Sequence, residues 1–180
     1  MKLLLVRHGH DLPGNNGDSA LSWQGKKQAA QTAQRMLDMG IRDIDAAYCS
    51  PARRAVETLS EITGIVSVNH QHCADELQPG QDPESLVSLV WRHWRDEPGV
   101  ILFVGHEPQL SNAVLRWCGL PENAERGCDT PPWVLGRGEG MLLSPSFNGA
   151  EIQLSSSLVS ILGRQRAFPG SRAPTRAGVF

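Results

Sequence analysis

The chain alternates between short runs that are entirely apolar and longer segments in which apolar residues recur every three or four positions. The clearest apolar runs cover residues 3–6 and 100–104 and contain no charged residue. Runs of this kind are typical of strands that are buried on both faces of a parallel sheet. The periodic segments predict helices that pack on such a sheet. The pattern therefore indicates an α/β fold.

Residues that are typical of helix ends flank the periodic segments and predict where four helices begin and end. Small polar residues cap helix N-termini with their side chains, proline is tolerated in the first turn, and glycine commonly ends a helix. On these grounds the expected helices run from Ser22 to Gly40, from Ser50-Pro51 to Gly64, from Asp82-Pro83 onward, and from Pro108 to Cys118.

Strands are expected where short apolar or alternating segments separate these helices. The sequence Asn148-Gly149, flanked by two such segments, is a strong hairpin signal. Residues 121–140 show no periodicity and predict a long loop. Beyond the two buried runs, the expected strands are Ile44 to Ser50, Ile65 to Val68, Met141 to Phe147 and Ala150 to Ser155.

The composition fits a single compact domain. The chain has 180 residues, of which 40% are hydrophobic, and its formal net charge is -2. A chain of this size buries a full core, and so small a net charge does not indicate a nucleic-acid partner. We expect one domain over residues 1–162. Residues 163–180 contain four arginines and no acidic residue, which predicts a basic C-terminal tail.

The sequence carries no signal for export or membrane insertion. No apolar stretch approaches the length of a transmembrane helix, and the first apolar run is too short for a signal peptide. The cysteines lack the paired spacing of zinc sites; they are Cys49, Cys73, Cys118 and Cys128. We therefore expect a cytoplasmic monomer with reduced thiols and no membrane contact.

Both buried runs end in a histidine and a glycine. The first is followed by Arg7-His8-Gly9, and the second by Gly105-His106. Ligands bind at the carboxyl ends of strands in open α/β sheets, and a glycine there lets a ligand approach the backbone closely. Arg54 falls in the first turn of a helix, where the helix dipole and free amides favour an anion. These positions together indicate a site that handles phosphate.

Each of these residues has an ordinary structural interpretation when it is taken alone. Neighbouring arginines such as Arg53 and Arg54 are most often solvated surface charge, and a single histidine is often a hydrogen-bonded core residue. His70 and His72 have no third ligand nearby in sequence, so an exposed loop pair is a better interpretation than a metal site. Two histidines at equivalent strand ends, with a helix-start arginine between them, favour function over coincidence.

Four segments, in this order and spacing, resemble the signatures of the histidine phosphatase superfamily, which has the phosphoglycerate mutase-like fold. They are Arg7-His8-Gly9, Leu21-Ser22-x-x-Gly25-x-x-Gln28-Ala29, Ser50-Pro51-x-x-Arg54-Ala55-x-Glu57-Thr58 and Gly105-His106-Glu107-Pro108. The resemblance implies a three-layer α/β/α architecture with a mostly parallel central sheet. The short chain and the segment Glu76-Leu77-x-Pro79-Gly80 most resemble the SixA-type phosphohistidine phosphatases.

The resemblance also implies roles for individual residues. His8 would accept the phosphoryl group, while Arg7, Arg54, a His106 imidazolium and Gly9 would bind its oxygens. Fixed positive donors of this kind stabilise a transferring phosphoryl group without a metal or other cofactor. For His8 to attack, one ring nitrogen must be unprotonated, which requires the other to donate to a group such as a backbone carbonyl.

The proton donor to the leaving group is left open by the sequence. Glu76 is the first candidate by resemblance, because many family members place a glutamate in the corresponding loop. Glu107, directly after the second histidine, is where another branch of the superfamily places its acid. A third alternative is that no such acid is needed.

Three functions are compatible with these residues. The favoured one is a metal-independent phosphatase that acts through a phosphohistidine on His8, with a phosphohistidine protein as its substrate. The runner-up is a phosphatase or mutase for a small phosphorylated metabolite, and a third is a non-catalytic phosphate-binding module. Only 51 residues separate Arg54 from His106, which leaves little room for a lid and favours an open site.

Overall fold

A six-stranded sheet forms the centre of the protein. The computed structural model describes residues 1–14, 18–93, 99–120, 134–148, 151–154 and 159–162. The strand order is β3-β2-β4-β1-β5-β8. Its strands are β1 (Lys2–Arg7), β2 (Asp43–Cys49), β3 (Ser67–Cys73), β4 (Val100–Gly105), β5 (Gly140–Leu143) and β8 (Val159–Leu162).

The sheet is mostly parallel, as the resemblance implies. Strands β1 to β4 pair in parallel, whereas β5 is antiparallel to both β1 and β8. Strand β5 therefore runs against the other five.

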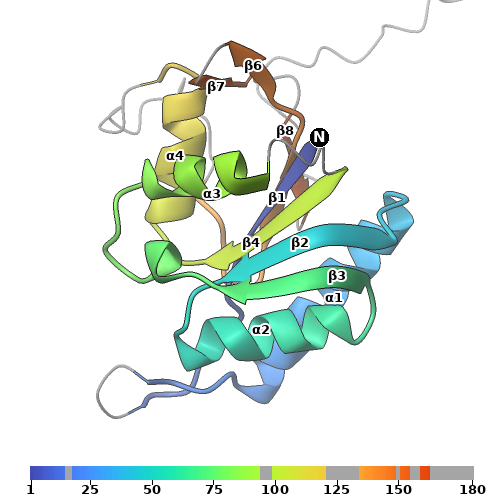
Figure 1. Cartoon of the computed structure of the whole chain (residues 1–180). Coiled ribbons are helices and arrows are strands. Elements are labelled where there is room, and N and C mark those ends of the chain that lie inside the picture. The colour runs from blue at the N-terminus through green and yellow to red at the C-terminus, as the bar shows by residue number, and fades with distance from the viewer. Residues whose placement is uncertain (15–17, 94–98, 121–133, 149–150, 155–158, 163–180) are drawn as a thin grey trace, which may run out of the picture.

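Within the described residues, four helices cover the two faces of the sheet. They are α1 (Trp23–Asp38), α2 (Arg53–Thr63), α3 (Ser85–His93) and α4 (Gln109–Trp117), and a short 3₁₀ turn, η2 (Asp75–Leu77), precedes α3. Figure 1 shows α1 and α2 together on one face, with α3 and α4 on the other. The three-layer α/β/α architecture is confirmed.

The apolar run of β1 is buried on both sides because helices cover both faces. Leu4 and Val6 belong to the cluster that contains α1 and α2 residues, whereas Leu3 and Leu5 belong to the cluster with α3 and α4. All four side chains are fully buried. Successive strand residues point to opposite faces, so a strand between two helical layers needs no polar alternation.

The first helix begins and ends as the sequence predicts. The Ser22 hydroxyl accepts a hydrogen bond of 3.0 Å from the Gly25 amide, so Ser22 is the N-cap of α1. Gly40 follows the helix with φ of +80°, the left-handed conformation that glycine adopts without strain.

The prediction that Ser50 and Pro51 cap and open α2 is wrong. This helix begins at Arg53, and Ala52 occupies the N-cap position without a side-chain cap. The Ser50 hydroxyl accepts from the Ala52 amide at 3.2 Å and lies 2.9 Å from a ring nitrogen of His106. Ser50 therefore contacts His106 at the end of β2, and α2 begins three residues later.

The third strand is longer than predicted and places two histidines differently. The expected strand covers residues 65–68, but β3 runs from Ser67 to Cys73. His70 and His72 therefore lie on a strand and not in a loop, although both are exposed as expected. Strand β3 lies at the edge of the sheet, where polar residues are tolerated, and this explains why its sequence shows no apolar alternation.

The last two predicted helices are correct in kind, with shifted ends. Helix α3 begins at Ser85 because the Asp82 carboxylate accepts from the Glu84 amide at 2.8 Å and forms a turn ahead of the helix. Helix α4 starts one residue after Pro108 and ends one residue before Cys118.

The predicted C-terminal hairpin is only partly correct. Strands β6 (Ser146–Asn148) and β7 (Glu151–Gln153) pair in antiparallel register, and the turn residues 149–150 between them lie outside the described residues. The expected strand over residues 141–147 is two strands, because Pro145 interrupts it and β5 joins the main sheet. Strand β8 is a further strand that the sequence pattern does not predict.

The expected basic tail, residues 163–180, lies outside the described residues and stays a prediction, as does the domain boundary at 162. None of the helices in the described part of the chain is long and apolar enough to cross a membrane.

Candidate active site

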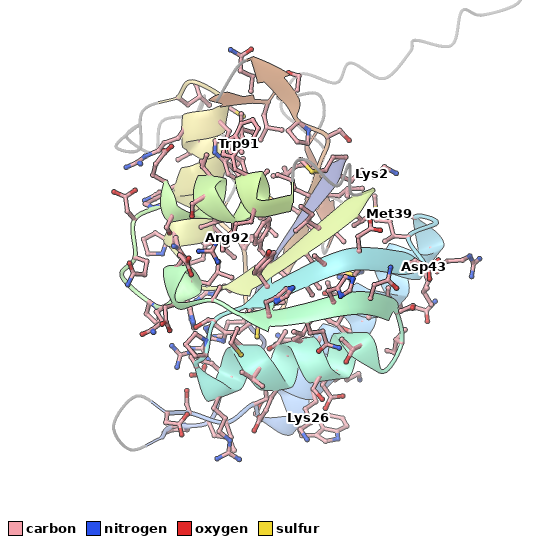
Figure 2. All side chains as sticks on the ribbon, viewed as in Figure 1. Lys2, Lys26, Met39, Asp43, Trp91 and Arg92 are labelled. Carbon is pink, nitrogen blue, oxygen red and sulfur yellow. The ribbon has the colours of Figure 1, made fainter. Side chains whose placement is uncertain are left out.

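The carboxyl ends of β1 and β4 bring the two predicted histidines together. Arg7 is the register partner of Gly105, and the His8 amide donates to the Gly105 carbonyl at 3.1 Å. The centroids of the His8 and His106 rings are 5.0 Å apart, with 53° between their planes. Lys2, Met39 and Asp43, labelled in Figure 2, mark the opposite end of the sheet.

The His8 ring is held in one tautomer by its own chain. Its Nδ1 lies 2.8 Å from the Gly9 carbonyl oxygen, which can only accept, so Nδ1 carries the proton and Nε2 does not. Burial, together with the nearby charges of Arg54 and Arg7, lowers the pKa of His8 to about 4 against the opposing effect of the Gly9 carbonyl. The imidazole is therefore neutral at pH 7, and Nε2 has a free lone pair.

His106 is held by side chains. Its Nδ1 lies 3.4 Å from Nη2 of Arg54, and its Nε2 lies 2.9 Å from the Ser50 hydroxyl. A guanidinium only donates, so Nδ1 accepts and the Nε2–H donates to Ser50. Burial, followed by the proximity of the His8 ring and the charge of Arg54, lowers the pKa of His106 to about 3. His106 is therefore neutral in this arrangement, and the imidazolium expected beside a bound phosphoryl group stays a prediction.

Arg54 lies at the site, whereas its neighbour Arg53 does not. In addition to its contact with His106, Arg54 donates from Nη1 to the Ser19 hydroxyl at 3.3 Å. Arg53 is exposed and pairs with Glu57 at 2.7 Å along the helix. The ordinary interpretation as solvated charge is thus correct for Arg53 only.

Arg7 supplies a second guanidinium close to both histidines. Its charge contributes to the lowered pKa of His8 and of His106. Nη1 donates to the Leu135 carbonyl at 2.8 Å, and the buried Nε has no hydrogen-bond partner among the described residues. A donor left without a partner beside two histidines suits an anionic ligand.

An open cavity of about 690 Å³ lies over His8 and Arg54. Its outer wall comes from two loops that are far apart in the sequence, residues 10–14 with Ser19 and the loop that carries Arg137. A phosphoryl group fills only part of this volume, so the outer wall faces whatever the phosphoryl group is attached to.

Asp11 and Arg137, which the sequence pattern does not single out, join these two loops. Arg137 donates to Asp11 Oδ1 at 2.5 Å, and the Ser19 hydroxyl donates to Oδ2 at 2.6 Å. Although burial raises the pKa of Asp11, the Ser19 hydrogen bond and the Arg137 charge outweigh it, so the pKa is lowered. No local sequence signal predicts this ion pair, because its members are 126 positions apart in the sequence.

Thr58 and Glu57, which belong to the segments that resemble the superfamily signatures, hold the backbone next to the site. The Gly9 amide donates to the Thr58 hydroxyl at 3.0 Å, and the Leu21 amide donates to Glu57 at 2.6 Å. A Cβ on Gly9 would lie 2.6 Å from the Gly25 carbonyl oxygen. Close packing against Gly25 therefore explains this glycine, and its contact with substrate stays a prediction.

The two candidate acids occupy different surroundings. Glu76 lies in η2 and forms an ion pair with Arg92 of α3, a residue labelled in Figure 2. Glu107 is mostly buried, and Oε1 accepts from the Ser111 hydroxyl at 2.7 Å and the Leu135 amide at 3.1 Å. Burial raises the pKa of Glu107, and Oε2 has no partner among the described residues. Within the described contacts, neither carboxyl reaches a histidine of the site.

Comparison with known proteins agrees with this geometry. Residues 3–86 match the sequence profile of the histidine phosphatase superfamily (branch 1). This match covers 84 of the 180 residues, so the N-terminal part of the chain is similar to members of this superfamily. Within the described residues there is no group of three or more His, Cys, Asp or Glu residues that could hold a metal ion.

Two curated relatives carry the name of phosphoglycerate mutases. The 2,3-bisphosphoglycerate-dependent phosphoglycerate mutase 1 of Nitrosomonas europaea is 30% identical over 76 residues, which are 39% of this chain and 32% of that protein. A protein of Erwinia tasmaniensis, named probable phosphoglycerate mutase GpmB, is 34% identical over 70 residues, 36% of this chain and 33% of that protein. The chain thus spans about a third of the length of these relatives.

Solved structures share the fold at low sequence identity. The protein histidine phosphatase SixA, in complex with tungstate, matches with a TM-score of 0.71 and 16% identity, covering 86% of this chain and 94% of that chain. Phosphoserine phosphatase from Entamoeba histolytica matches with a TM-score of 0.60 and 19% identity, over 91% and 98% of the two chains. The predicted phosphoglycerate mutase-like fold of this chain is confirmed.

Proposed function

We propose that this chain is a phosphatase that transfers the phosphoryl group of its substrate to His8 and then to water. The observation that carries the proposal is the His8 hydrogen bond to the Gly9 carbonyl, which leaves Nε2 with a free lone pair inside the cavity. The low pKa of this ring, about 4, keeps the nucleophile unprotonated at neutral pH. The match to the superfamily profile and the phosphatases among the fold relatives support the same activity.

In the first step, Nε2 of His8 attacks phosphorus while the bond from phosphorus to the leaving group breaks. In the second step, water attacks the phosphohistidine, the phosphorus–nitrogen bond breaks, and phosphate and a neutral His8 are released. Both transition states spread negative charge over the equatorial oxygens. We assign Arg7, Arg54 and His106 to these oxygens, because fixed donors stabilise developing charge without reorganising.

The low pKa of His106 suggests when an imidazolium would form. A ring with a pKa of about 3 is neutral before substrate arrives. A phosphate dianion close to the ring favours the protonated form, so substrate binding raises this pKa. His106 thus takes up a proton only with its ligand in place, which avoids a buried charge in the empty site.

The same surroundings favour a phosphohistidine substrate over an alkyl phosphate. An alkoxide leaves poorly without a general acid, and neither Glu76 nor Glu107 contacts His8 or His106 among the described residues. An imidazole can leave already protonated. The fold relative SixA is a protein histidine phosphatase, and the outer cavity wall of this chain offers room for a large substrate.

The main test follows phosphate on the protein and uses His8→Ala. The wild type is expected to release phosphate from a histidine-phosphorylated protein in the presence of EDTA and to yield acid-labile phosphate on His8 after rapid quenching. His8→Ala should lose at least roughly 10⁴-fold in turnover, because the covalent route is gone, and His70→Ala, at an exposed position, should retain activity. Wild-type binding of phosphate with no turnover of any substrate would indicate a binding module instead.

A second candidate, a phosphatase or mutase for a small metabolite, is favoured by the names of the curated relatives. The same assay should therefore include 3-phosphoglycerate and an alkyl phosphate. A mutase would move the phosphoryl group to another position of its substrate without releasing phosphate. Faster turnover of a metabolite than of the phosphohistidine protein would decide for this candidate.

The proton donor is tested by comparing leaving groups. If Glu76 is the acid, as the resemblance predicts, Glu76→Gln should slow an alkyl phosphate by about 10²- to 10⁴-fold and p-nitrophenyl phosphate far less. Arg54→Ala should slow both substrates alike, since it removes charge stabilisation common to each, and Arg53→Ala is its matched control. A selective loss in Glu107→Gln instead would assign the acid to the buried carboxyl.

A further inference from the structure

Two cysteines end neighbouring strands at the edge of the active-site face. Cys49 is the last residue of β2, Cys73 is the last residue of β3, and the two are register partners. Their sulfur atoms are 3.9 Å apart. Both are free thiols in this structure.

The backbone geometry allows a bond between them. Paired strands lie about 4.7–4.9 Å apart, which falls within the Cα separation of about 4.4–6.8 Å that disulfides need. Closing the bond requires the sulfur atoms, now at 3.9 Å, to approach by roughly 1.9 Å to the bonded distance. Side-chain rotation supplies much of such a movement.

The two thiols differ in their access to solvent. Cys73 is exposed, so a small oxidant reaches its sulfur directly. Cys49 is only 3% exposed, and burial, with the neighbouring Cys73, raises the pKa of Cys49 to about 12. Oxidation therefore begins at Cys73, and Cys49 is protected until its partner has reacted.

We propose that Cys73 and Cys49 form a redox modification site, at which a peroxide produces a disulfide that slows turnover at the adjacent active site. The Cys73 thiolate attacks hydrogen peroxide, the oxygen–oxygen bond breaks, and a sulfenic acid and hydroxide form. The Cys49 sulfur then attacks the sulfenic sulfur, and its proton leaves with the sulfenic hydroxyl as water. The pair loses two electrons to the peroxide.

The effect on turnover follows from the residues next to the pair, and this part rests on the proposed function. Cys49 directly precedes Ser50, whose hydroxyl fixes the Nε2–H of His106 at 2.9 Å. The Cys49 carbonyl also accepts from the Ala74 amide at 2.9 Å. A disulfide draws Cys49 toward β3 and so displaces Ser50 from His106.

The chemical test does not depend on activity. Reduced full-length protein is treated with hydrogen peroxide, remaining thiols are alkylated, and the peptides are mapped by mass spectrometry. A Cys49–Cys73 cross-link lighter by two hydrogens is expected, and it should be absent from Cys73→Ser and retained in Cys118→Ser. The proposed disulfide would be refuted if Cys73 were over-oxidised or linked to another molecule while Cys49 could still be alkylated after unfolding.

The second measurement concerns turnover. Oxidised wild type should lose roughly tenfold in rate, the effect of a disturbed positioning hydrogen bond, and dithiothreitol should restore it. Cys73→Ser should match the reduced wild type before and after peroxide. A cross-linked protein with unchanged turnover would refute the coupling between the disulfide and the active site. A protein that is inactive on every substrate would refute the proposed function, and the mapped cross-link would still decide whether the redox site exists.

Discussion

The ends of β1 and β4 carry similar sequences but hold their histidines in different ways. His8 is oriented by the carbonyl of the next residue in its own chain. His106 is oriented by two side chains from other elements, Ser50 at the end of β2 and Arg54 in α2. Both rings are buried, and both have a lowered pKa.

This difference suits different roles in the proposed reaction. A main-chain partner occupies only one nitrogen of His8 and leaves the other free to form a bond. The two side-chain partners occupy both nitrogens of His106, so this ring can act only after one of them yields. We expect His8 to bond to phosphorus and His106 to respond to the ligand.

Among changes that leave the covalent step possible, replacing His106 should reduce turnover the most. His106→Asn removes one donor to the phosphoryl oxygens, and turnover should fall about 10²- to 10³-fold. Rapid-quench labelling should still detect phosphate on His8, in contrast to His8→Ala. If His106→Asn abolishes labelling while the protein remains folded, the two rings do not have separate roles.

Removing the partner of His106 should have a smaller effect. Ser50→Ala deletes the acceptor at 2.9 Å from Nε2, and the loss of a positioning hydrogen bond costs roughly tenfold in rate. The loss should be rescued in Ser50→Thr, which keeps the hydroxyl, and Ser60→Ala on the exposed face of α2 is the control. A rate unchanged in Ser50→Ala would show that Arg54 alone orients His106.

The smallest expected effect is on the stability of the fold, and it follows from the lowered pKa values that His8 and His106 share. Their folded pKa values, about 4 and about 3, lie below the ordinary histidine value of 6.5. Between pH 6.5 and 4 the unfolded chain therefore binds protons that the native protein does not, so stability falls as pH falls through this window. The loss at pH 5.5 relative to pH 7 should be about 1 kcal/mol for each histidine.

Urea denaturation at pH 7 and pH 5.5 measures this loss. His106→Asn should show a smaller difference between the two pH values than the wild type, because one of the contributing groups is gone. NMR should also show the ring signals of both histidines unchanged from pH 8 to pH 5.5. Titration of either ring near the ordinary histidine pKa would contradict the burial argument.

Much of the fold could be predicted from local pattern. The apolar runs at residues 3–6 and 100–104 predict buried strands because their character is a property of each segment. The same holds for α1, since the Ser22 cap and the left-handed Gly40 involve only neighbouring residues. His8, Arg54 and His106 could be placed at one end of the sheet because parallel strands end on the same side.

The partners of these residues were decided by tertiary structure. Ser50 followed by Pro51 is typical of a helix N-cap, yet the Ser50 hydroxyl lies against His106, which is 56 positions away. Asp11 meets Arg137 across 126 positions, and Cys49 meets Cys73 only because β3 is the strand next to β2. Sequence pattern reports which side of an element is buried, whereas strand order and register determine what that side contacts.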